Sequence, residues 1–268
     1  MRPFKYSLQN RGLCSELNSV LGIYQKCREL GTYSFIYGAE SLYFQKIKFW
    51  QVFKPHEFLK GFPPPNSQLY KSSRVFNVKE ARTYARTTYK QSMSNLDASQ
   101  ALVFQNNFKK SLLQLIESVK LPKKFNTIHI RWGDKVGDLW DRETILRGST
   151  EAKKKFFADY FKPLKNIPIG TIFIMTDDIT SIDLAKDFLK SQNLPHKIKF
   201  LTRAEQKGRS ESQDLDAKKQ YSREELLQFF AEIEIAKRSQ FFVGTRTSNV
   251  YRYIKNTCKS RTKFISID

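Results

Sequence analysis

Apolar residues recur along the chain in two rhythms, one typical of helices and the other typical of strands. In the segment 15–30 they fall on one helical face, with Ser15 as the predicted N-cap. The longest helical pattern covers 97–120, and Pro122 forbids its continuation. Further helical patterns cover 181–192, 222–239 and 249–256. Apolar runs suited to strands occupy 33–38, 126–132, 171–178, 196–202 and 240–248.

Strands that alternate with helices predict an α/β protein with parallel sheets and helices on both faces. A chain of 268 residues is long enough for two modest cores. We place the boundary between two such sheets near the long helix. The prediction is an N-terminal domain of residues 1–120 and a C-terminal domain of residues 121–268.

Polar residues gather where three of the predicted strands end. The three segments read "HIRWGDKVGD" from His129, "MTDD" from Met175 and "VGTRTSN" from Val243. In open parallel sheets, ligands bind beyond the carboxyl ends of the strands, so three polar ends predict a shared pocket. An anionic ligand suits Arg131, because a guanidinium binds phosphate through two parallel charge-assisted hydrogen bonds.

Each of these residues also has a purely structural explanation, which the sequence leaves open. Arg131 can pair with Asp134 or Asp177, and His129 can be a buried core residue. In "GTRTSN", Gly244, Thr247 and Ser248 stand where free N–H groups and a helix dipole favour an anion, but a threonine or serine there can simply cap the helix. The two carboxylates after Thr176 can begin a loop or hold a metal ion. We expect no metal, because the sequence has no third ligand at a spacing typical of metal sites.

The composition adds a net charge of +21, which raises the possibility of a nucleic-acid partner. The basic residues are spread along the whole chain and no nucleic-acid-binding motif is present, so we expect no nucleic-acid partner. Three cysteines without metal-ligand spacing favour a reducing compartment. With no apolar leader and no membrane-length apolar run, the chain is expected to be soluble and cytoplasmic. No feature of the sequence indicates an oligomeric state.

The motifs also resemble those of the GT-B glycosyltransferases that make α-1,6-fucose linkages, the core and Nod-factor fucosyltransferases. Their hallmark H-x-R-R-x-D-K-V-G is similar to "HIRWGDKVG", and their "TDD" matches Thr176 to Asp178. Their final motif, which ends F-x-V-x-T-x-S-S-x-V-x-R, resembles "FFVGTRTSNVYR". Near the N-terminus, "RGLCSELNSV" and "FWQVFKP" resemble two further family segments.

This resemblance implies a GT-B-like fold, with two Rossmann-like domains whose parallel sheets face a central cleft. The N-terminal domain, 1–120, would be the acceptor side, and the C-terminal domain, 121–268, would bind the nucleotide-sugar. It implies an inverting transfer of a sugar from a nucleoside-diphosphate sugar to a glycan acceptor, with no metal and no cofactor. The roles it implies are these: Arg131 holds the β-phosphate, His129 contacts the nucleoside, Gly12 and Ser248 add phosphate donors, Glu232 reads the base, and Lys135 lies near the reacting centre. Cationic and N–H donors there would stabilise the charge that the departing diphosphate gains.

Departures from the family pattern bear on the substrate. Trp132 replaces the second arginine, and Glu232 replaces the aspartate that reads guanine. The family's catalytic carboxylate position is Leu139, so we take Asp138 as the candidate general base and Asp141 as the second candidate. The donor is then GDP-fucose or another nucleotide-sugar, including a UDP-linked pentose such as xylose.

Two other functions remain open at this stage. A basic nucleic-acid-binding protein would bind oligonucleotides with an affinity that falls steeply with salt. A glycosyltransferase-like fold that has lost its activity would fit the changes at Trp132 and Leu139.

Overall fold

The computed structural model of the chain describes residues 3–8, 12–37, 43–44, 48–61, 73–75, 101–131, 150–165, 170–204, 206 and 221–268. Contacts between residues divide the chain into two units. Unit 1 comprises Met1–Leu113, Lys218–Phe229 and Arg252–Lys259, and unit 2 comprises Gln114–Ala217, Phe230–Tyr251 and Ser260–Asp268. Unit 1 thus contains most of the predicted N-terminal domain and two segments from later in the chain. The functions assigned to the two domains stay predictions.

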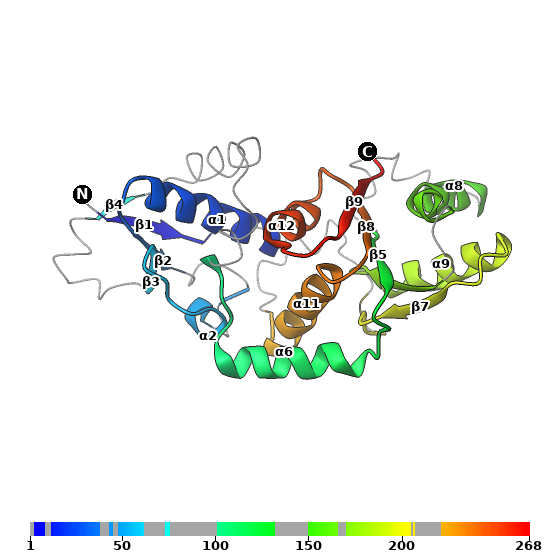
Figure 1. Ribbon diagram of the computed structural model, residues 1–268, viewed down its shortest axis with the longest axis horizontal. Coiled ribbons are helices and arrows are strands. Elements are labelled where there is room, and N and C mark those ends of the chain that lie inside the picture. Colours follow the sequence, from blue (N-terminus) through cyan, green and yellow to red (C-terminus); the bar gives the residue numbers. More distant parts are fainter. Residues whose placement is uncertain are drawn as a thin grey trace. The chain divides into compact units, whose positions relative to one another are not determined.

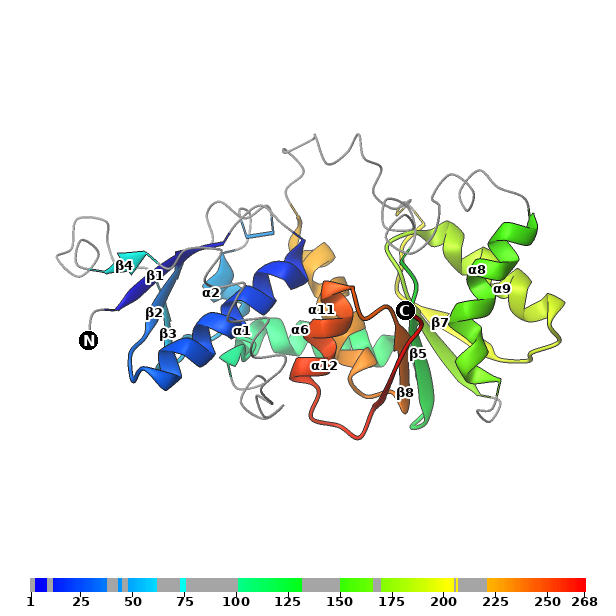
Figure 2. The same cartoon turned by 90° about the horizontal axis from the view of Figure 1, so that it is seen from above.

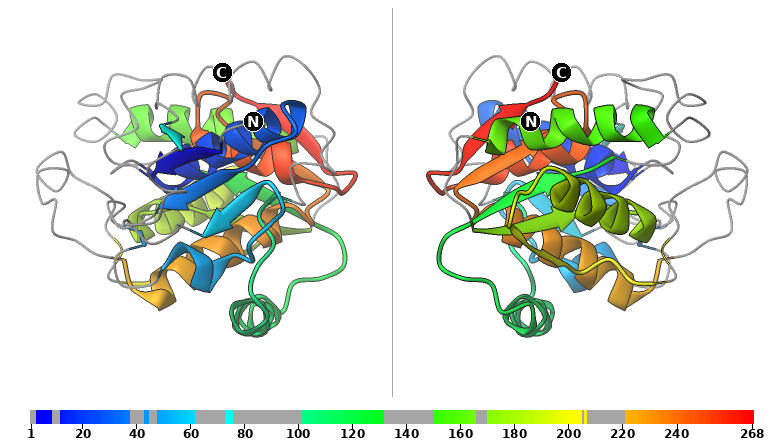
Figure 3. Two further views of the ribbon diagram at one scale, coloured as in Figure 1. Left: turned by 90° about the vertical axis from the view of Figure 1, so that its left-hand side faces the viewer. Right: turned by 90° about the vertical axis from the view of Figure 1, so that its right-hand side faces the viewer.

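Unit 1 contains a sheet of four short parallel strands. The strands are β1 (Phe4–Ser7), β2 (Ser34–Tyr37), β3 (Leu59–Gly61) and β4 (Arg74–Val75), in the spatial order β3-β2-β1-β4. Helix α1 (Leu13–Glu29) connects β1 to β2 and contacts the sheet, as the left view of Figure 3 shows. Two further helices belong to this part of the chain, the single turn α2 (Phe49–Val52) and α6 (Asn106–Ser118).

Helix α1 was predicted correctly as an element, but its beginning was not. The N-cap is Gly12, and Ser15 lies inside the helix, where its N–H donates to the Gly12 carbonyl at 2.8 Å. At the other end, Thr32 N–H donates to the Cys27 carbonyl and Gly31 N–H to the Arg28 carbonyl, with Gly31 at φ +61°. This pair of bonds is a Schellman motif, and glycine adopts its left-handed conformation without a steric cost.

The long helix predicted over 97–120 is shorter in the structure. Helix α6 begins at Asn106, because residues just before it pair with another segment instead. Lys54 N–H donates to the Val103 carbonyl at 2.7 Å, and Gln105 N–H donates to the Val52 carbonyl at 2.8 Å. These bonds use backbone groups that a longer helix would need.

Unit 2 contains a sheet of five parallel strands. The strands are β5 (Phe125–His129), β6 (Thr171–Met175), β7 (Lys197–Phe200), β8 (Phe241–Gly244) and β9 (Lys263–Ser266), in the order β7-β6-β5-β8-β9. The connecting helices are α8 (Thr150–Phe161), followed by the turn η2 (Lys162–Leu164), then α9 (Ile179–Ser191), α11 (Arg223–Ala236) and α12 (Asn249–Thr257). Figures 1 and 2 show α8 and α9 on the same face of the sheet, and the right view of Figure 3 shows them in front of it.

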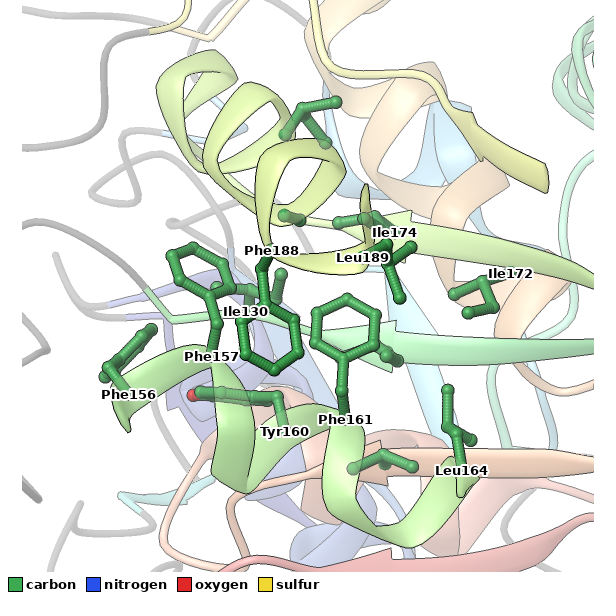
Figure 4. Close-up of a cluster of buried hydrophobic side chains, with 14 residues drawn as sticks. Ile130, Phe156, Phe157, Tyr160, Phe161, Leu164, Ile172, Ile174, Phe188 and Leu189 are labelled. Atoms are coloured by element: carbon green, nitrogen blue, oxygen red, sulfur yellow. The ribbon is translucent and has the colours of Figure 1, made fainter. Parts of the chain in front are cut away.

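An aromatic core joins α8 and α9 to the sheet of unit 2. Phe161 and Phe188 stack with ring centroids 5.4 Å apart (Figure 4), and Ile128 and Ile130 belong to the same buried cluster. Both isoleucines are fully buried on this face, so the alternation of "TIHI" places His129 on the opposite face. The described part of the chain holds no helix long and apolar enough to cross a membrane.

The core predicts a large effect of a single truncation. Phe161→Ala removes a ring that is 1% exposed, and we expect it to lower the free energy of unfolding by about 3–5 kcal/mol. Urea denaturation measures this change. Lys190→Ala, an exposed position on the same helix as Phe188, serves as the control and should change stability by less than about 0.5 kcal/mol. An equal loss in both variants would contradict the core assignment.

Candidate functional site

The order of strands in unit 2 defines where a ligand fits. The chain begins in the middle of the sheet at β5, proceeds outward to β6 and β7, and then returns to the other side of β5 with β8 and β9. The connections that follow β5 and β8 therefore diverge, and an open α/β sheet binds its ligands at such a switch point. The carboxyl ends of β5 and β8 carry His129 and Gly244, which the sequence predicted as site residues.

His129 lies against β8 with little space to spare. Its ring stacks on Phe242, with centroids 6.4 Å apart and planes 16° apart. A β-carbon added at Gly244 would lie 3.5 Å from His129 Cβ and 3.3 Å from Tyr251 Cδ2. Glycine at this position therefore lets the two strand ends approach without moving either ring.

The surroundings of His129 keep its imidazole neutral. Burial, with a further contribution from the positive charge of Arg131, lowers the pKa of His129 to about 3. Its Nδ1 atom is buried and has no hydrogen-bond partner among the described residues. A neutral imidazole offers one donor and one acceptor, which suits an uncharged polar group of a ligand better than a phosphate.

Thr245, which follows Gly244, carries a second unpaired group. Its side chain is fully buried, and its Oγ1 atom has no hydrogen-bond partner within the described ranges. Buried polar atoms are nearly always paired, so each unpaired one requires an explanation. Nine buried side-chain atoms of the described residues are unpaired, and two of them lie at the carboxyl edge of the unit 2 sheet, His129 Nδ1 at the end of β5 and Thr245 Oγ1 just beyond β8.

Arg131 stands just beyond β5, with its backbone held by helix α8. Its N–H donates to the Tyr160 hydroxyl at 3.3 Å. Burial raises the pKa of Tyr160 to about 12, while Arg131 acts in the opposite direction and the negative charges of Asp268 and Asp177 add to the increase. Three charged groups, those of Arg131, Asp268 and Asp177, therefore lie close enough to the Tyr160 hydroxyl to change its pKa. The sequence did not indicate Tyr160, because it lies 29 positions beyond Arg131 inside a predominantly basic and apolar segment.

The two carboxylates after β6 have different environments. Asp178 caps α9, since its Oδ1 accepts hydrogen bonds from Thr180 N–H at 2.8 Å and from the Thr180 hydroxyl at 2.7 Å. Asp177 is exposed. The residues that the structure describes contain no group of three His, Cys, Asp or Glu side chains placed to hold a metal ion. Independence from metal stays a prediction.

The turn between β8 and α12 differs from the expectation of free N–H groups. Ser248 is a helix cap, because its Oγ accepts from Val250 N–H at 3.2 Å. The N–H groups of Arg246 and Thr247 donate to the two carboxylate oxygens of Asp268, at 2.7 and 3.0 Å. The sequence predicted an anion at this turn, and the anion present is a side chain of the protein itself. Asp268 was not among the predicted residues.

The remaining predicted residues are Gly12 in unit 1, Glu232 in α11, and three that lie beyond the described ranges. Gly12 belongs to unit 1, with φ −58°, and its carbonyl accepts from the first turn of α1. Glu232 is buried in α11 at 4% exposure. The three predicted catalytic residues, Lys135, Asp138 and Asp141, lie outside the residues that the structure describes.

The fold has the architecture of the GT-B-like glycosyltransferases, with α/β organisation and parallel sheets. A fucosyltransferase NodZ from Bradyrhizobium is similar with a TM-score of 0.55 and 12% identity, covering 95% of this chain and 92% of that chain. POFUT1 in complex with GDP-fucose is similar with a TM-score of 0.52 and 10% identity, covering 99% of this chain and 98% of that chain. No protein-family model and no curated protein sequence matches the chain. The likeness therefore establishes the fold, and the function has to be argued from the site.

The buried neutral histidine predicts a pH dependence of stability. The native pKa of His129 is about 3 and its ordinary value is 6.5, so the unfolded chain binds the extra proton between these values. Stability is therefore complete above the ordinary value and is lost as the pH falls through this window. Between about pH 7.5 and about pH 5, wild type should lose roughly 2 kcal/mol more than His129→Gln. Urea denaturation at the two pH values measures the difference, and parallel losses would contradict the assignment.

Proposed function

We propose that this protein is a glycosyltransferase that takes a sugar from a nucleoside-diphosphate donor bound at the carboxyl edge of the unit 2 sheet. The observation that supports it most is the pair of unpaired buried atoms at the switch point, His129 Nδ1 at the end of β5 and Thr245 Oγ1 just beyond β8. A nucleotide-sugar has both kinds of group that this edge can bind. Its uncharged nucleoside suits the neutral imidazole, and its diphosphate suits the guanidinium of Arg131.

The structural neighbours support this choice of ligand. POFUT1 was solved with GDP-fucose, and the NodZ α-1,6-fucosyltransferase was soaked with GDP-fucose. We propose GDP-fucose or a UDP-sugar such as UDP-xylose as the donor, an inverting mechanism without metal, and Asp138 or Asp141 as the general base. An inverting transfer requires such a base to take the proton of the acceptor hydroxyl, an effect of about 10²–10⁴-fold. Lys135 would then stabilise charge near the reacting centre, and Glu232 would contact the base of the nucleotide.

Arg131 provides the direct test of donor binding. A panel of GDP, UDP, GDP-fucose and UDP-xylose should raise the melting temperature of wild type for at least one ligand, since a ligand at 100 times its Kd adds roughly 2.7 kcal/mol. Arg131→Ala should lose most of that shift because the phosphate loses its cation, while the melting temperature without ligand stays close to that of wild type. Thermal shift measures both.

A matched control is Arg238→Ala, which removes an exposed arginine before the opposite end of β8. This variant should keep the full ligand-induced shift. No shift with any nucleotide, together with salt-sensitive oligonucleotide binding, would favour the nucleic-acid-binding alternative. Nucleotide binding without transfer would favour the inactive glycosyltransferase-like fold.

For the acceptor, we propose an open depression of about 940 Å³ in unit 1. Four amide side chains line it beside the ring of Trp50, from Gln51, Gln105, Asn106 and Asn107. Gln105 Nε2 donates to the Trp50 and Phe53 carbonyls, and Gln51 Oε1 accepts from Lys48 N–H, so the two exposed asparagines are the main candidates to bind a sugar. Each amide combines a donor and an acceptor, which matches sugar hydroxyl groups that also do both, and an indole ring offers an apolar face. The Trp50 side chain is held by a bond from Nε1 to the Ile36 carbonyl at 3.3 Å.

Removing two of these amides tests the acceptor proposal without a donor. Asn106 and Asn107 are exposed, so the double variant Asn106→Ala/Asn107→Ala should fold as wild type does. On a glycan array it should lose the signals that wild type gives by at least about tenfold, the factor of one net hydrogen bond. Gln192→Ala, which removes an exposed amide in unit 2, should leave the signals unchanged. Equal signals from all three proteins would place the acceptor elsewhere.

A further inference from the structure

The turn between β8 and α12 binds a carboxylate in the manner in which such turns bind phosphate. Arg246 N–H donates to Asp268 Oδ1 at 2.7 Å, and Thr247 N–H donates to Asp268 Oδ2 at 3.0 Å. Each carboxylate oxygen thus takes one of two consecutive backbone N–H groups, which together form an anion-binding concavity. The Ser266 hydroxyl donates to the same carboxylate.

The rest of the turn leaves few other N–H groups for an external anion. Ser248 N–H donates to the Thr245 carbonyl at 3.0 Å, and Val250 N–H donates to Ser248 Oγ at 3.2 Å. Although burial acts to raise it, the hydrogen bonds from Ser266, Arg246 and Thr247 lower the pKa of Asp268 to about 2. The carboxylate is therefore ionised at neutral pH and fills the concavity with a full negative charge.

The backbone that carries Asp268 is fixed, whereas its side chain is free to rotate into water. The backbone before it is fixed, since β9 pairs with β8 and Ile267 N–H donates to the Gly244 carbonyl at 3.1 Å. The Asp268 side chain itself is exposed, so a rotation would return its charge to water rather than to the interior. The negative charge also reaches the neighbouring site, because it contributes to the raised pKa of Tyr160 beside Arg131.

We propose that Asp268 is an internal competitor for phosphate, whose carboxylate occupies the N–H groups of Arg246 and Thr247 until a phosphate group of the ligand displaces it. This inference rests on the proposed function for the identity of the ligand. It assigns Asp268 a part in setting donor affinity. A phosphate that displaces the carboxylate gains two N–H donors next to the end of β8 and removes a repulsive charge from the approach to Arg131.

The test uses inorganic pyrophosphate and the full chain labelled with ¹⁵N. In wild type, the amide signals of Arg246 and Thr247 should move only at high pyrophosphate concentration. In Asp268→Ala the same signals should move with a Kd at least about tenfold lower, the factor of one charge-assisted hydrogen bond. Asp268→Asn, which keeps an acceptor but loses the charge, should lie between the two. Asp187→Ala, which removes an exposed carboxylate from α9, should behave as wild type does.

A permanent structural role for Asp268 predicts the opposite result. Pyrophosphate affinity would then be unchanged or weaker in Asp268→Asn, and that outcome overturns the proposal even if Asp268→Ala fails to fold. The nucleotide panel on the same variants separates this inference from the proposed function. Tighter pyrophosphate binding in the Asp268 variants, without nucleotide binding by any of the proteins, would refute the proposed function alone. Nucleotide binding with no gain in either Asp268 variant would refute the competitor role alone.

Discussion

The pairing of β5 with β8 is the constraint on which the candidate site depends. Parallel pairing of Thr127 with Phe242 and of Ile128 with Val243 brings two strand ends together that are more than a hundred residues apart in the chain. The connections that follow these strands lead to different helices, α8 and α12, and an open α/β sheet binds its ligands at such a switch point. A β-carbon at Gly244 would lie only 3.3 Å from Tyr251 Cδ2 and in ordinary contact with His129, so a larger residue there would have to displace the Tyr251 ring.

At the carboxyl edge of the unit 2 sheet, a neutral side chain and a cationic side chain lie within three residues of each other in the chain. His129 is buried and kept neutral, with an unpaired nitrogen, whereas Arg131 is less buried and its guanidinium is a cation that only donates hydrogen bonds. The arrangement follows from the alternation of the strand, which puts Ile128 and Ile130 into the aromatic core and leaves His129, between them, for the other face. A ligand with an uncharged part and an anionic part, side by side, matches this order. A nucleoside diphosphate is such a ligand.

The parts of the structure that the sequence predicted are those set by local patterns. Periodicity located α9, α11 and α12 and the five apolar strand runs, because burial of one face imposes it. It failed where distant segments interfere, as at Val103 and Gln105, whose backbone pairs with the segment around Val52 and delays the start of α6. Tyr160 and Asp268 reach the site only through tertiary contacts, and no local pattern marks them. Ser248 had two interpretations; its bond to Val250 N–H shows that it caps the helix, and its contact with a donor phosphate stays a prediction.

This chain shares its fold with solved structures to which its sequence is only 10–12% identical. The turn that holds Asp268 illustrates how a fold tolerates such divergence. Burial and strand order require only apolar residues at the right period, and these survive extensive substitution. An anion-binding turn requires only backbone N–H groups, which every residue except proline carries. Neither the fold nor the turn therefore requires particular side chains. The group that supplies the anion in the turn can then differ from one protein to another. In this protein the carboxylate of Asp268, two residues after β9, supplies that anion, and the competition between it and a phosphate is then a property of this chain rather than of the fold.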